Sequence, residues 1–274
     1  MFQSDIGSIT RKTLWKICLY LITFLIVVTK YLKGGVRKME EVKLGIYVPS
    51  YGRAKTTTTY KLIDDCTYVV RKSEEQAYRE AGVPKIWAVD DDKIDSLVKV
   101  SNYINEHSPE EIIFTIDDDV DSFLYRMDKN IKLEDKEAII CEIERIAQIM
   151  LDLGIGFGAE DAAIAPWNYV AEFTFKGTTG AMRWYNKNVY KSRFDEKVYH
   201  NCDIDVMLHE LLVNRIILRP MYFCVNAGTD TNAGGNSSKT RQAQIDCVTE
   251  MKRRWGRHFD YNFKNNKPSI KVER

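Results

Sequence analysis

The chain has 274 residues, of which 45% are hydrophobic and 29% are charged, and its formal net charge is +1. This is ordinary globular composition, and the length allows one large domain or two small ones. Six scattered cysteines include no C-x-x-C pair, which excludes a zinc site of that type, gives no obvious disulfide framework and favours a reducing compartment.

The small net charge hides an uneven distribution. Residues 1–38 carry seven Lys or Arg against one Asp, and residues 239–274 carry ten Lys or Arg against four acids, so each segment has a net charge of +6. The stretch 39–238 therefore carries 1 − 12 = −11. A basic tail on an acidic body suits an anionic partner, although a solvated basic helix has the same composition.

The first 38 residues form a segment of their own. The thirteen residues between Lys16 and Lys30, ICLYLITFLIVVT, are uncharged. A spanning helix needs about 20 apolar residues, a length that snorkelling by the two lysines would supply. The segment reads as a signal-anchor that holds a cytoplasmic catalytic domain at a membrane. No small-residue cleavage site follows it, which argues against a cleaved signal peptide.

The alternative is that residues 1–38 are upstream sequence and translation starts at Met39. The codons for KGG at 33–35 can form a bacterial ribosome-binding sequence, three codons before Met39. From Met39 the charge is 33 − 38 = −5. The protein would then be soluble and cytoplasmic, in the host cytoplasm if a phage encodes it.

Apolar runs alternate with helical patterns in the first half of the chain. Strands are predicted at Leu44–Pro49, Thr67–Val70, Lys85–Val89 and Glu111–Ile116, and helices at Ser73–Ala81 and Ile94–Glu106. This alternation predicts right-handed βαβ units and a parallel sheet that is buried on both faces.

The pattern changes after a long predicted helix. The later elements are expected as helices at Leu133–Leu153, Ile204–Val213 and Lys239–Trp255, and strands at Ala171–Phe175, Ala181–Tyr185 and Ile216–Val225. The fold class is therefore α/β, with a mostly parallel central sheet and a smaller mixed or antiparallel extension.

Polar residues follow three of the predicted strands, at Ser50–Arg53, Asp90–Asp92 and Asp117–Asp119. Open parallel sheets bind ligands beyond the carboxyl ends of their strands. Capping is the favoured role for Asp90–Asp92, since Lys93 and a helix start come next. The adjacent carboxylates of Asp117–Asp119 repel one another unless a cation neutralises them. Oxygen ligands of this kind suit Mg²⁺ or Mn²⁺ bridging to a diphosphate, whereas capping or solvation is the structural alternative.

Three motifs resemble the GT-A glycosyltransferases, whose fold is Rossmann-like and binds nucleotide-diphospho-sugars. They are YVPSYGRA after the first strand, V-x-x-S-E-E-x-x-Y at Val70–Tyr78, and the apolar run into three aspartates at Phe114–Asp119. The resemblance covers about Lys43 to Trp255. Within that group the chain looks most like the phage and TET/JBP-associated glycosyltransferases, inferred to decorate hypermodified DNA bases such as hydroxymethylpyrimidines.

The resemblance implies roles for residues at the strand ends. Asp117 would face the nucleoside and share the Mn²⁺ or Mg²⁺ with Asp119. The donor, expected to be UDP-glucose or a similar UDP-sugar, would be bound by Pro49, Ser50, Tyr51, Arg53, Asp117, Asp118, Gly177 and Gly180. A hairpin turn is the alternative for the two glycines.

Two acidic residues at the start of a late helix complete the implied site. Asp203 and Asp205 resemble the late acidic motif of GT-A enzymes, where a carboxylate faces the acceptor as a general base. Asp203 also suits a helix N-cap. Many GT-A enzymes add a late metal-binding His, which the loop Asn226–Ser238 lacks. Asn226 or water is left as the third ligand.

The implied organisation is a GT-A catalytic domain at 39–238, with a basic helix and tail at 239–274 packing on it. In the tail, Arg253, Arg254 and Arg257 are candidates for phosphate contacts, while Trp255 is expected in the core.

The expected function is metal-dependent sugar transfer to a hydroxyl acceptor, with hydroxymethylated bases in phage DNA as the first choice. The rivals are a membrane-associated transferase of cell-surface glycan synthesis, a sugar-nucleotide nucleotidyltransferase and a non-catalytic nucleic-acid-binding protein. The nucleotidyltransferase is disfavoured because the first loop is not glycine-rich. The non-catalytic reading leaves Asp117–Asp119 unexplained.

A chain that begins at Met39 is expected to be soluble without detergent and as active as the full chain, because the first strand begins only at about Val42. Expression of both forms, followed by sedimentation and donor hydrolysis assays, measures this. Insolubility or lost activity of the shorter chain would favour a genuine membrane anchor.

Overall fold

The computed structural model describes residues 42–227 and 240–272. Residues from Val42 onward form one compact unit. The predicted segment 1–38 lies outside the described residues, as does nearly all of the predicted loop Asn226–Ser238. None of the helices in the described ranges is long and apolar enough to cross a membrane.

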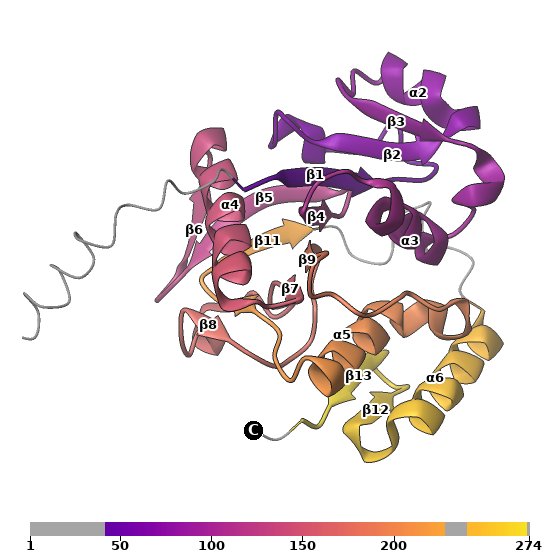
Figure 1. Cartoon of the computed structure of the whole chain (residues 1–274), viewed down its shortest axis with the longest axis vertical. Helices are drawn as coiled ribbons and strands as arrows, with labels where there is room; N and C mark the ends of the chain where they lie inside the picture. The colour runs from indigo at the N-terminus through magenta and orange to yellow at the C-terminus, as the bar shows by residue number, and fades with distance from the viewer. Residues whose placement is uncertain (1–41, 228–239, 273–274) are drawn as a thin grey trace, which may run out of the picture. The chain divides into compact units, whose positions relative to one another are not determined.

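A six-stranded sheet with the order β3-β2-β1-β4-β9-β7 lies at the centre of the described unit (Figure 1). β1 runs parallel to β2 and β4, and β2 runs parallel to β3, whereas β9 is antiparallel to β4 and β7. The predicted α/β class with a mostly parallel central sheet is confirmed. The strands are β1 (Leu44–Pro49), β2 (Thr67–Arg71), β3 (Ile86–Val89), β4 (Ile112–Ile116), β7 (Phe157–Ala159) and β9 (Met182–Asn186).

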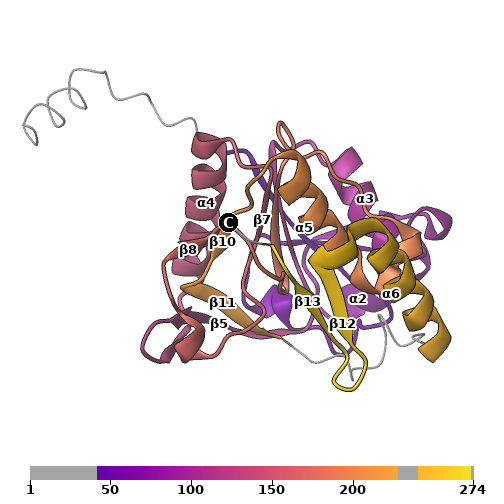
Figure 2. The same ribbon diagram turned by 90° about the horizontal axis from the view of Figure 1, so that it is seen from below.

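Helices cover both faces of this sheet, which explains the continuous apolar runs of β1 and β4. Ile46 and Val48 belong to the core cluster that includes α4, whereas Tyr47 belongs to the cluster that includes α3, α5 and α6. Figure 2 shows α4 on one side of the strands and α3, α5 and α6 on the other. The helices are α2 (Glu75–Glu80), α3 (Leu97–His107), α4 (Lys136–Leu153), α5 (Cys202–Val213) and α6 (Arg241–Trp255).

A smaller antiparallel sheet with the order β11-β5-β6 forms the mixed extension. Its strands are β5 (Val120–Arg126), β6 (Asn130–Leu133) and β11 (Phe223–Ala227), and a short pair joins β8 (Phe173–Thr174) to β10 (Arg219–Pro220). β5 and β6 were not predicted, because β5 lacks strict alternation and β6 is largely exposed. α4 starts later than expected because β6 occupies Asn130–Leu133, and Asp135 then caps the helix by accepting the N–H of Glu137 at 2.9 Å.

The acidic run Asp90–Asp92 lies on the surface after β3. Asp91 accepts the backbone N–H of Ser73 at 3.1 Å, and α3 is instead capped by Ser96, which accepts the N–H of Lys99. The expected cap of the following helix is therefore not observed; Asp91 instead binds the first turn of the preceding 3₁₀ segment, Lys72–Glu74.

The C-terminal segment packs α6 against α5 and ends in a hairpin of β12 (Phe259–Asn262) and β13 (Lys267–Ile270). Trp255 is partly buried in the cluster that includes α5, and its indole donates to Asp205 at 2.7 Å. The predicted helix is present, but the hairpin was not expected, because basic and polar residues interrupt its apolar alternation.

Candidate functional site

The carboxyl ends of β1, β4 and β7 meet at one edge of the sheet, together with the start of the antiparallel β9. This arrangement brings together Ser50–Arg53, Asp117–Asp119, Glu160 and Lys176–Ala181. Backbone contacts join these segments directly. The N–H of Asp117 donates to the carbonyl of Ala181 at 3.2 Å, and the N–H of Gly180 donates to the carbonyl of Glu160 at 3.1 Å.

The middle aspartate is buried between β4 and the loop after β1. Only 4% of Asp118 is exposed, and its carboxylate accepts hydrogen bonds from Ser50 and, at 2.8 Å, from Arg53. Burial raises the pKa of Asp118, against the opposing effects of Ser50 and Arg53. Its backbone carbonyl accepts the hydroxyl of Thr57 at 2.7 Å. Asp118 thus fixes the β1 loop, and Ser50 also lies 2.6 Å from the hydroxyl of Tyr78.

The outer aspartates face different arginines. Asp119 accepts from Arg53 at 3.0 Å, and Asp117 lies 3.4 Å from Arg183 on β9. The Asp117 side chain is 42% exposed, compared with 15% for Asp119. Partial enclosure by the protein raises the pKa of Asp117 to about 6, with Asp118 and Asp119 adding to the rise and Arg183 opposing it. The turn Asp117–Asp119, called the acidic turn below, is therefore exposed to solvent at Asp117. Its negative charge is only partly neutralised by the two arginines.

Arg183 lies within electrostatic reach of both Asp117 and Asp203. Its Nε is buried and has no hydrogen-bond partner among the described residues. Asp203, in the first turn of α5, accepts the hydroxyl of Thr179 at 2.7 Å. A carboxylate is favoured at a helix N-terminus by the helix dipole. Asp203 is thus held near Arg183 and Thr179, at the end of the sheet where β4 stops and β9 begins.

Asp205 has a different environment from Asp203. Its two oxygens accept the indole N–H of Trp255 at 2.7 Å and a guanidinium N–H of Arg254 at 3.0 Å. Residues two apart on a helix do not face the same side, so Asp203 and Asp205 cannot both point at one acceptor. The contacts of Asp205 tie α5 to α6.

The two predicted glycines pack closely against charged side chains. Gly177 has a φ of +135°, and a Cβ there would lie 2.0 Å from the guanidinium of Arg219. A Cβ on Gly180 would lie 2.5–2.9 Å from the side chain of Glu160. Both positions therefore need glycine, because a larger residue would collide with these side chains. The close contacts let the segment between β8 and β9 pack against the end of the sheet.

The loop after β1 presents its aromatic ring at the surface. Tyr51 is 48% exposed, and the guanidinium of Arg71 lies 3.9 Å from the centre of its ring. Pro49 ends β1 opposite Val69, and Gly52, with a φ of +67°, turns the chain while its N–H donates to Glu74. Tyr51 thus lies half-exposed at the end of β1 with Arg71 over one face of its ring, at the position where the resemblance expects a nucleotide base.

Two buried acids at the end of β7 were missed in the sequence. Glu160 is 2% exposed and accepts the N–H groups of Ala181 at 2.7 Å and Val225 at 2.8 Å. Asp161 pairs with Arg126 at 3.0 Å and Arg219 at 2.6 Å. The only signal available was their position after the short run FGA, which is too brief to stand out as a strand.

The acidic turn offers part of a metal site. Within the described residues, no group of three or more His, Cys, Asp or Glu side chains is arranged to hold a metal ion. Mg²⁺ and related ions at nucleotides usually bind one or two carboxylates plus substrate phosphates, so a complete protein cage is not required. The hard oxygen donors of Asp117 and Asp119 fit such a site. Asn226, the remaining candidate ligand, is exposed at the end of β11.

Comparisons with known proteins identify the fold. No protein-family model matches the chain, and no curated protein sequence matches it. Glucosyl-3-phosphoglycerate synthase from Mycobacterium tuberculosis, solved with Mn²⁺, UDP-glucose and glycerol 3-phosphate, matches with a TM-score of 0.50 at 7% identity, over 85% of this chain and 87% of that one. This similarity shows the fold of nucleotide-sugar transferases of the GT-A type.

Two further solved structures are similar to the chain. A mannosyltransferase from Pyrobaculum calidifontis, in complex with GDP-mannose and Mn²⁺, matches with a TM-score of 0.48 at 12% identity, over 79% of this chain and 68% of that one. A CMP-2-keto-3-deoxy-manno-octonic acid synthetase with CTP matches with a TM-score of 0.41 at 13% identity, over 69% of this chain and 93% of that one.

Glu160→Gln is expected to destabilise the fold by about 1–3 kcal/mol, because the amide NH₂ cannot accept a backbone N–H and leaves a buried donor unpaired. Burial raises the pKa of Glu160 to about 8 from 4.5, so the folded protein keeps this carboxyl protonated at pH values where the unfolded chain loses the proton. The stabilisation that Glu160 adds to the free energy of unfolding is therefore fully present below pH 4.5 and is lost as the pH rises towards 8. The destabilisation should therefore shrink across this window.

Urea unfolding near both ends of that window measures the effect, and Glu144→Gln, at an exposed position on α4, is the matched control. An equal loss of stability by Glu160→Gln at both pH values would contradict the assigned role of the buried carboxyl.

Proposed function

We propose that this chain is a glycosyltransferase that moves a sugar from a nucleotide-diphospho-sugar to an acceptor hydroxyl. The observation that carries the proposal is the meeting of Asp117–Asp119, Arg183 and Asp203 at one edge of a GT-A sheet. A diphosphate needs cationic partners, and an acceptor hydroxyl needs a base; this edge offers groups suited to both roles.

The donor is proposed to bind across the ends of β1 and β4. Tyr51 offers an exposed ring for the base, and the open carboxylate of Asp117 faces the space beyond β4. Asp119, together with Asp117, would hold Mn²⁺ or Mg²⁺. The bound ion would act as a Lewis acid that offsets charge on the leaving diphosphate. UDP-glucose is the first candidate donor, since UDP-glucose and Mn²⁺ are bound by the structural neighbour with the same fold.

Asp203 is proposed as the general base for the acceptor hydroxyl. Thr179 donates to one of its oxygens and fixes the orientation of the carboxylate. No other hydrogen bond to this carboxylate occurs in the described part of the chain, so its second oxygen is available to take a proton from the acceptor. Arg183 lies within electrostatic reach of Asp203 and adds a positive charge on this side of the proposed site. Asp205 is excluded from this role, because Trp255 and Arg254 occupy both its oxygens.

The acceptor is proposed to be DNA that carries hydroxymethylated bases. The motif resemblance and the basic C-terminal segment support this choice. A cell-surface glycan is the alternative acceptor if residues 1–38 anchor the chain in a membrane. A nucleotidyltransferase is less well supported, because Arg53 in the first loop is engaged by Asp118 and Asp119 instead of being available for a triphosphate.

Asp119→Ala is expected to abolish sugar transfer and the thermal stabilisation that Mn²⁺ and the donor give together, while the ligand-free fold survives. The change removes a metal ligand but also relieves repulsion in the acidic turn. Thermal unfolding with and without Mn²⁺ and UDP-glucose, with turnover measured in parallel, tests this. Asp121→Ala, at an exposed position two residues further along, is the control. Near wild-type turnover of Asp119→Ala would remove this residue from the site.

Asp203→Asn is expected to lower sugar transfer by about 100-fold or more, because positioned general bases contribute about 10²–10⁴-fold. Donor-dependent stabilisation by Mn²⁺ should be unchanged, since Asp203 lies on the acceptor side. Steady-state transfer assays with hydroxymethylated DNA and thermal unfolding with donor separate the two effects. A rise in KM for the donor without a fall in kcat would assign Asp203 to donor binding instead.

A further inference from the structure

The structure divides the basic C-terminal segment into two groups of cations. Arg254 pairs with Asp195 and Asp205, and Arg253 pairs with Glu250 at 2.7 Å. The expectation that Arg254 contacts phosphate is therefore wrong: its guanidinium holds α6 to the rest of the fold. By contrast, Arg257 forms no ion pair with any described residue.

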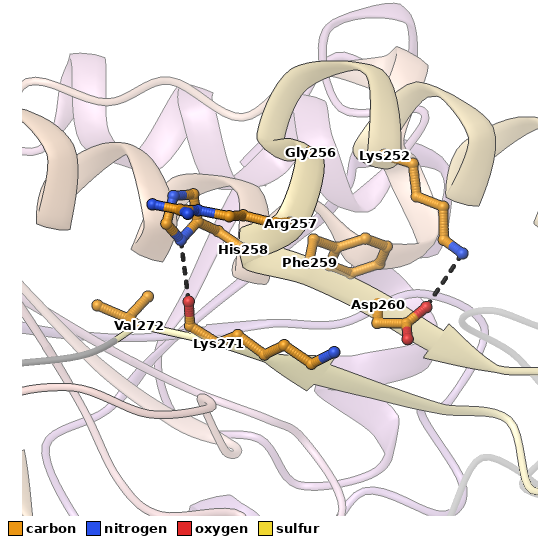
Figure 3. A pocket seen from close by; sticks show the side chains of 8 residues that line it. All are labelled: Lys252, Gly256, Arg257, His258, Phe259, Asp260, Lys271 and Val272. Atoms are coloured by element: carbon orange, nitrogen blue, oxygen red, sulfur yellow. Dashed lines mark hydrogen bonds and ion pairs between the residues drawn. The ribbon is translucent and has the colours of Figure 1, made fainter.

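A hollow of about 790 Å³ lies beside Arg257, between the end of α6 and the hairpin (Figure 3). It is lined by Lys252, Gly256, Arg257, His258, Phe259, Asp260, Lys271 and Val272. Asp260 is the single acid among these residues and pairs with Lys252 at 3.0 Å. Lys271, like Arg257, has no ion pair within the described ranges. The hollow therefore has an excess of positive charge facing solvent.

The hairpin below this hollow has two distinct faces. Phe259, Ile270 and Val272 are directed into the core cluster of α5 and α6. Side chains alternate along a strand, so the intervening residues face outward. The strand register places Asn262 opposite Lys267 and Asp260 opposite Ser269, and the N–H of Lys271 donates to the carbonyl of His258. The outer face is thus polar, with the exposed Lys267 at the start of β13 and the exposed Lys271 directly after its end.

The exposed lysines of the hairpin are separated along the chain. Lys267 and Lys271 lie four residues apart, a rise of about 13.6 Å along an extended chain, so they can contact different phosphates of one polymer. His258 supports the arrangement, because its Nδ1 donates to the carbonyl of Lys271 at 2.9 Å.

We infer that the outer face of the β12–β13 hairpin, together with the adjoining hollow, is a docking surface for the phosphate backbone of duplex DNA. The surface comprises Arg257, Lys267 and Lys271. The inference rests on the proposed function for the identity of the acceptor and adds the place where that acceptor is held. The stretch 39–238 carries a net charge of −11 and repels a polyanion, so attraction must come from a local basic surface.

The test is the salt dependence of DNA binding by the full chain. Each phosphate contact contributes about 0.9 to the slope of log K against log salt. Arg257→Ala/Lys267→Ala/Lys271→Ala is expected to reduce this slope by about 2.7. Between about 50 and 200 mM salt, the wild type should then lose about 40-fold more affinity than the variant. Fluorescence anisotropy with labelled hydroxymethylated duplex measures both proteins.

The matched control removes three positive charges elsewhere. Lys129→Ala/Lys132→Ala/Lys136→Ala changes exposed or partly exposed side chains around β6 and should leave the slope unchanged. Equal slopes for wild type and the hairpin variant would overturn the inference. So would hairpin-dependent binding to phosphatidylserine vesicles without hairpin-dependent binding to DNA, which would make the surface a membrane contact.

Hydrolysis of UDP-glucose without acceptor, measured on the same proteins, separates the two proposals. Hydrolysis by the wild type with equal salt slopes would leave the transferase standing and remove the hairpin site. Different salt slopes with no hydrolysis or transfer would support the hairpin as a DNA-binding surface and count against the glycosyltransferase.

Discussion

Three consecutive carboxylates end β4, and their mutual repulsion constrains everything around them. Arg53 from the β1 loop and Arg183 from β9 lie against the outer two, while Ser50 and Arg53 hold the middle one in the protein. Charges that close are tolerated only with opposite charge or hydrogen bonds nearby. The turn therefore fixes where the β1 loop and β9 must lie, and those segments in turn shape the proposed donor site.

A second group of charges supports the same edge from beneath. Asp161 is buried between Arg126 and Arg219, and Arg219 also donates to the carbonyl of Lys176 at 2.8 Å. Removing Asp161 would leave two buried guanidinium groups without their shared carboxylate, at a cost of about 3–5 kcal/mol. Together with Glu160, this group holds the segment that carries Gly177 and Thr179. The proposed catalytic groups thus lie next to a buried network of ion pairs and hydrogen bonds. Such a network suits a site that must position two substrates.

The structure gives different meanings to residues that look equivalent in the sequence. Asp203 and Asp205 are two positions apart, yet one lies beside Thr179 and the other binds Arg254 and Trp255. Helical rotation separates them by more than half a turn. In the same way, Arg253 and Arg254 are adjacent to one another, but only Arg254 is used inside the fold.

Much of the fold could be predicted from local patterns. Leu44–Pro49 has the predicted bounds, and the other strands of the parallel half agree within a residue, because a strand buried on both faces needs an unbroken apolar run. The acidic turn was also visible, since its residues are contiguous. Tertiary structure alone decided which arginine faces which carboxylate, and that Glu160 and Asp161 lie beside the same end of the sheet. It also decided that the basic tail consists of a helix bound to α5 through Arg254, followed by an exposed hairpin. These features join residues far apart in the chain, and their pairing depends on burial and distance, which no short stretch of sequence contains.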